Sequence, residues 1–112
     1  MSIYTARQIG KTWEKRLGLG AWKIKYKWGV HTEEYGTANF DICHRIAMIS
    51  LNKQTHLPKE ITVEYVIVHE LLHLVLVELE IVEKAKTDQK ELALERTINQ
   101  LTNALLERHT HG

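Results

Sequence analysis

The feature that most constrains this chain is a long apolar run, residues 61–82, that contains the motif His69-Glu70-Leu71-Leu72-His73. Residues four apart share one face of a helix, so both imidazoles could bind one Zn²⁺ at about 2.0–2.1 Å. Glu70 lies about 100° around the helix from His69, where it could accept a proton from a water beside the metal. Ionisable residues are rarely buried unless they are paired or bind a metal. The motif therefore predicts a zinc site with ligands His69 and His73 and catalytic Glu70.

Length and composition predict one folded domain, residues 1–112, because 44% of the residues are hydrophobic and 26% are charged. The formal net charge is +1 and both signs are interspersed, which argues against a nucleic-acid or membrane surface. A single cysteine excludes an internal disulfide. The first residues lack a signal pattern, and the apolar run carries too many ionisable residues to span a bilayer. We therefore expect a cytoplasmic protein.

Sequence patterns predict an α+β domain in the order helix, three strands, helix, helix, with a small, mostly antiparallel sheet. The first helix is capped by Ser2, and strand 22–28 alternates large apolar residues with lysine. Pro58 signals the start of the motif helix, and Asp88 with Glu91 forms a capping box for the last helix. The expected helices are residues 3–17, 58–82 and 88–108, and the expected strands are residues 22–28, 36–42 and 45–52.

The last helix is expected to supply a third zinc ligand, because a hydrolytic zinc site usually has three protein ligands and one water. Its predicted apolar stripe is Leu94, Ile98, Leu101 and Leu105, and two glutamates fall on the inward side of this stripe. Glu91 already serves the capping box, whereas Glu95 lies one turn deeper and has no such role. Glu95 is therefore favoured, with Glu91 as the alternative. Asn99, four residues after Glu95, could hold the outer nitrogen of a histidine ligand.

Together, His69-Glu70-Leu71-Leu72-His73 and Glu95-Arg96-Thr97-Ile98-Asn99 resemble the motifs of the gluzincin zinc metallopeptidases. Those enzymes pair a His-Glu-x-x-His helix with a later glutamate helix that often has an acid or Asn four residues after the ligand. The short chain and its element order resemble the minigluzincins, which are reduced zinc-peptidase catalytic domains. The resemblance implies zinc, a peptide or protein substrate, and peptide-bond hydrolysis. No residue here obviously matches the oxyanion-stabilising Tyr or His of some relatives.

Three functions are compatible with these motifs. The favoured one is a zinc metallopeptidase, active or latent, in which the strand 45–52 forms the rim of the cleft and its exposed edge pairs with an extended peptide. The second is a catalytically silent zinc-binding module or zymogen-like scaffold, which would not need Glu70. The third is a structural or partner-binding domain without a metal, in which both histidines are ordinary helix residues.

Several residues outside the motifs are weaker candidates. His109 and His111 lie in a short C-terminal tail, and one of them could fill the open metal position of a neighbouring molecule, giving a latent, self-associated form. Cys43 could act as a blocking thiolate, and His56 could line the cleft. The simpler interpretations are a frayed tail, a packed cysteine and a solvated histidine.

Overall fold

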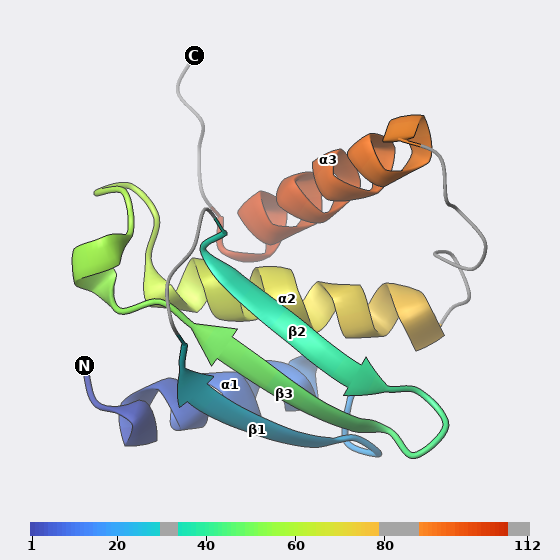
Figure 1. Ribbon diagram of the computed structural model, residues 1–112, viewed down its shortest axis with the longest axis horizontal. Coiled ribbons are helices and arrows are strands. Elements are labelled where there is room, and N and C mark those ends of the chain that lie inside the picture. Colours follow the sequence, from blue (N-terminus) through green and yellow to red (C-terminus); the bar gives the residue numbers. More distant parts are fainter. Residues whose placement is uncertain (30–33, 79–87, 108–112) are drawn as a thin grey trace.

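The computed structural model describes residues 1–29, 34–78 and 88–107, and it confirms the α+β class (Figure 1). None of the helices in these ranges is long and apolar enough to cross a membrane. The elements in chain order are α1 (Ile3–Arg16), β1 (Lys23–Trp28), β2 (Gly36–Asp41), β3 (Ile46–Leu51), the short 3-10 helix η1 (Gln54–His56), α2 (Val63–Glu78) and α3 (Asp88–Leu105).

The sheet is mixed, with the strand order β1-β3-β2. β2 pairs with β3 in the antiparallel sense, and β1 pairs with β3 in the parallel sense. The central position of β3 contradicts the prediction that strand 45–52 offers an exposed edge, because both of its edges carry ladder hydrogen bonds. Within the described ranges, β2 forms the outer strand on the side of the sheet nearer α2 (Figure 1).

One face of the sheet packs on the helices and the other is open. Alternate residues of β1 and β3 are buried, whereas the three lysines of β1 are exposed, as the alternating pattern predicts. Trp13 and Trp22 are also buried in the core. The Trp13 indole additionally donates a hydrogen bond to Glu64 (2.8 Å), which joins α1 to α2.

Helix α2 lies between α1 and α3 and also contacts β2 and β3 (Figure 1). This position explains why its sequence is apolar on nearly every side. The helix begins at Val63 rather than Pro58, because the Thr62 hydroxyl accepts a hydrogen bond from the Tyr65 N–H (3.0 Å) and so caps the first turn. Residues 79–82 of the predicted helix lie outside the described residues. The last helix ends at Leu105 and not at residue 108 as predicted, because residues 106–107 form a turn in which Glu107 has a φ of 53°.

Helix α3 is turned differently from the predicted apolar stripe. Ile98 and Thr102 are fully buried, whereas Leu101 and Leu105 are 39% and 40% exposed. Thr102 tolerates burial because its hydroxyl donates to the carbonyl of Ile98 (2.7 Å) and leaves no unsatisfied donor. This orientation leaves Glu95 half-exposed at the surface that faces the motif histidines.

Gly36, the first residue of β2, allows the strand to lie directly on α2. A Cβ atom at this position would meet a Val66 methyl carbon at 2.6 Å and the Ser50 carbonyl oxygen at 2.9 Å. Both atoms belong to packed elements, so a side chain here would push β2 away from the helix. The same Cβ would also lie 3.7 Å from Glu70 Cγ, which places the beginning of β2 against the motif glutamate.

We predict that Gly36→Ala lowers the free energy of unfolding by about 1–3 kcal/mol, the usual cost of overpacking a filled interior. Gly20→Ala is the matched control, since a Cβ at Gly20 has no atom within 4 Å, and its effect should be close to zero. Denaturant unfolding of both variants measures the difference. Equal stability of the two variants would show that β2 is not held against α2 as described.

Candidate metal centre

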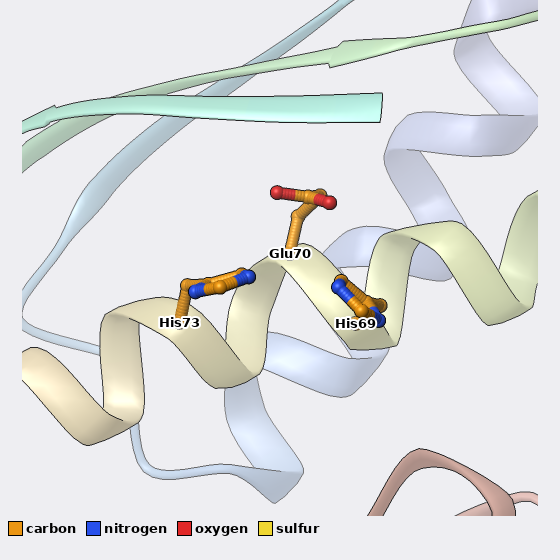
Figure 2. A group of neighbouring side chains, drawn as sticks. All are labelled: His69, Glu70 and His73. Carbon is orange, nitrogen blue, oxygen red and sulfur yellow. The ribbon is translucent and has the colours of Figure 1, made fainter. Parts of the chain in front are cut away.

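His69 and His73 project from consecutive turns of α2, and Glu70 points away from them towards β2 (Figure 2). The two imidazole rings have their centroids 5.3 Å apart. One ligand atom from each of the three side chains lies within 4.8 Å of the other two. Helical spacing alone produces this cluster, which is why the sequence could predict it.

Glu95 brings a carboxylate from α3 to both imidazoles. Its Oε2 lies 3.2 Å from His69 Nε2, and its Oε1 lies 3.1 Å from His73 Nε2. In the metal-free protein these distances correspond to hydrogen bonds from imidazole N–H groups to the carboxylate. The structure places Glu95, the favoured candidate, beside the motif, and its choice over Glu91 stays a prediction. The side chain of Glu91 lies outside the described residues.

The donor set fits a small divalent cation. Nitrogen and oxygen donors placed tetrahedrally at about 2.0–2.1 Å from zinc lie roughly 3.3 Å apart, close to the spacings found here. Burial lowers the pKa of His73, although the nearby Glu95 partly opposes this effect. Its imidazole is therefore neutral at pH 7 and has a lone pair to offer a metal. Two imidazoles and one carboxylate form the ligand set of a well-known class of hydrolytic zinc sites.

These groups line a cavity of about 640 Å³, a size typical of small-molecule and peptide-binding sites. α2 and α3 supply His69, Glu70, His73 and Glu95, and β2 supplies its residues 36–40. The described lining contains two histidines and three glutamates, namely His69, His73, Glu34, Glu70 and Glu95. A cation would offset the negative charge that these carboxylates concentrate.

Glu70 has the most strongly perturbed acidity of the site. Its side chain is almost completely buried beneath β2, and this burial, followed by the charges of Glu95 and Glu34, raises its pKa to about 8. At neutral pH the metal-free protein therefore holds Glu70 mostly protonated. A cation bound by the histidines would favour the carboxylate, so metal binding and the proton affinity of Glu70 are coupled.

The weaker candidates are not brought to this cavity. Cys43 is exposed in the turn between β2 and β3, and His56 is exposed in η1. Neither residue lines the cavity, which does not support the alternative roles of Cys43 as a blocking thiolate and of His56 as a lining residue. The favoured interpretation of Cys43 as a packed residue is wrong, because its side chain is exposed. His109 and His111 lie outside the described residues.

Asn99 lies on α3 as predicted, but its side-chain oxygen accepts a hydrogen bond from the hydroxyl of Tyr65 (3.3 Å) rather than holding a histidine. Tyr65 is not among the predicted site residues, because in the sequence it resembles one more apolar residue of the motif helix. The signal was its position four residues before His69, since that spacing places it on the histidine face. Its ring centroid lies 6.3 Å from that of His69.

Comparisons with known proteins identify no family for this chain. No protein-family model, curated protein or solved structure matches the chain.

Metal-free Glu70→Gln should become more stable relative to wild type as the pH rises from about 4.5 to about 8. In this interval the folded wild type keeps a proton on Glu70 that the unfolded chain releases, so wild-type stability falls with pH until the folded carboxyl ionises. Urea unfolding at several pH values in the presence of a chelator measures the gain.

Glu60→Gln makes the same change at an exposed carboxylate. Its free energy of unfolding should vary with pH as that of wild type does. If Glu70→Gln also parallels wild type between these pH values, the pKa of Glu70 is not raised.

Proposed function

We propose that this chain is a zinc-dependent metallopeptidase that hydrolyses peptide bonds. The observation that carries the proposal is the meeting of two imidazoles from α2 and a carboxylate from α3 at 3.1 and 3.2 Å, beside the buried Glu70. His69, His73 and Glu95 would hold the zinc, and Glu70 is left over for proton transfer. A site that only held a metal would have no use for this fourth ionisable group.

Zinc, when bound, supplies a Lewis acid that polarises the carbonyl and lowers the pKa of a water towards about 7. Glu70 then accepts the proton of the attacking water and delivers it to the departing amine. Glu95 and the two histidines fix where the peptide carbonyl must lie.

The cavity wall formed by β2 supports an extended peptide as the substrate. β2 is the outer strand on this side of the described sheet, and its residues 36–40 line the cavity beside Glu70. An outer strand can accept another chain through backbone hydrogen bonds, so a peptide added to β2 would pass over the metal ligands. This replaces the central strand β3 as the predicted peptide-pairing edge.

Purified protein should bind one zinc per chain, and His73→Ala should abolish stoichiometric binding because it removes one ligand. Glu95→Gln should weaken zinc binding far more than Glu91→Gln, because Glu91 is not an assigned ligand and Gln can also serve in a capping box. Elemental analysis and chelator competition measure both effects. Full zinc in His73→Ala, or the reverse ranking of the glutamates, would contradict the assigned ligands.

Wild-type protein loaded with zinc should cleave members of a peptide library, and Glu70→Gln should lose cleavage while it retains zinc. The amide cannot accept the water's proton, but it is nearly the same size as the carboxyl group. Mass spectrometry of the digested library, with parallel zinc analysis, gives both readouts.

His73→Ala is the control for metal-independent contamination and should neither bind zinc stoichiometrically nor cleave. Zinc binding without cleavage in every preparation, including chains that lack His109 to Gly112, would instead favour the catalytically silent zinc-binding module.

A further inference from the structure

A second contact between α2 and α3 lies one helical turn from the metal ligands. Tyr65 precedes His69 by four residues, and Asn99 follows Glu95 by four residues. The Tyr65 hydroxyl donates a hydrogen bond to Asn99 Oδ1 (3.3 Å). Because the two helices run in opposite directions at this point, these spacings place the Tyr65–Asn99 pair directly beside the pair formed by His69 and Glu95.

The two sides of the ligand set depend on different restraints. His69 and His73 belong to one helix, so its backbone fixes their separation. Glu95 belongs to another helix, and its position depends on how α3 is turned about its own axis. The buried Ile98 sets the depth at which α3 packs, but apolar contacts have little directional preference. A hydrogen bond is directional, and Asn99 projects from nearly the same side of α3 as Glu95.

We propose that Tyr65 is a positioning residue for the metal centre, which it serves by holding Asn99 and thereby turning Glu95 towards the two histidines. This inference rests on the proposed zinc site. Tyr65 is only 8% exposed, so its ring occupies one position and presents the hydroxyl to α3 from a fixed point. The ring also packs beside that of His69, with 33° between the two planes. Tyr65 therefore contacts one ligand directly and orients another through Asn99.

The role of the hydroxyl can be separated from the structural role of the residue. The N-terminal cap of α2 uses the backbone N–H of Tyr65, which Tyr65→Phe retains. The aromatic ring and its packing on His69 are also retained. Tyr65→Phe therefore removes one hydrogen bond between the helices and keeps the start of the helix and its apolar contacts.

The experiment measures zinc affinity by chelator competition for wild type, Tyr65→Phe, Asn99→Ala and the double variant. Loss of an outer-sphere partner usually weakens metal binding about 10–100-fold, and we expect about tenfold for Tyr65→Phe. The zinc affinity of the double variant should be no lower than that of the more impaired single variant, because both substitutions break the same hydrogen bond. The visible spectrum of bound Co²⁺ should also change in Tyr65→Phe, as the carboxylate ligand shifts.

Tyr35→Phe is the matched control, because Tyr35 lines the same cavity but is 43% exposed. Within the described residues, its hydroxyl makes no hydrogen bond to Asn99 or to α2. It should bind zinc and Co²⁺ as wild type does. Thermal unfolding of the metal-free proteins should give nearly equal midpoints for Tyr65→Phe and wild type.

Equal zinc affinity of Tyr65→Phe and Tyr35→Phe would overturn the inference while leaving the zinc site intact. Additive losses in the double variant would also overturn it, since the two groups would then act separately. A lower unfolding midpoint with unchanged affinity would assign Tyr65 to packing alone. Absence of stoichiometric zinc from wild type would overturn the proposed function and, with it, this inference.

Discussion

Helix α2 is apolar and enclosed, yet it carries one buried and two partly buried ionisable side chains, Glu70, His69 and His73. α2 is enclosed by α1, the sheet and α3, and this enclosure removes water from Glu70 and partly from both histidines. Buried ionisable groups destabilise a fold unless something satisfies them. Glu95 satisfies the histidines in the metal-free protein, and a cation would satisfy all four groups together. The site thus follows from the packing that encloses α2.

The two sides of the cavity have different physical origins. Its floor is set by helical spacing, which fixes His69, Glu70 and His73 relative to one another. Its walls are tertiary: β2 approaches Glu70 because Gly36 has no side chain, and α3 presents Glu95 because Ile98 and Thr102 are the residues it buries. These walls raise the pKa of Glu70, since β2 covers its side chain and the negative charge of Glu95 lies nearby. The packing of β2 and α3 on α2 therefore sets both the pKa of Glu70 and the position of Glu95 relative to the histidines.

Sequence reasoning succeeded where the signal is local. Ser2 caps α1 through its hydroxyl, as predicted, and the alternation of lysine with large apolar residues located β1 to within one residue. It failed where pairing is long-range. The alternation of polar and apolar residues identifies a strand but not its neighbours, so it could not predict the central position of β3. Pro58 suggested a helix start, but the hydroxyl of Thr62 decides where α2 begins. Glu95 lies beside the histidines as expected, although α3 buries Ile98 and Thr102 instead of the predicted apolar stripe. Tyr65 was missed although it lies four residues before His69, because its partner Asn99 is 34 residues later in the chain.

X-ray absorption at the zinc edge can establish whether α2 and α3 together hold one zinc ion. We expect two imidazole nitrogens and at least one carboxylate oxygen at about 2.0–2.1 Å from the metal. The imidazole scattering should fall to that of one ring in His73→Ala loaded with excess zinc. A spectrum of wild type with a sulfur ligand at about 2.3 Å, or without imidazole scattering, would show that these residues do not form the zinc site.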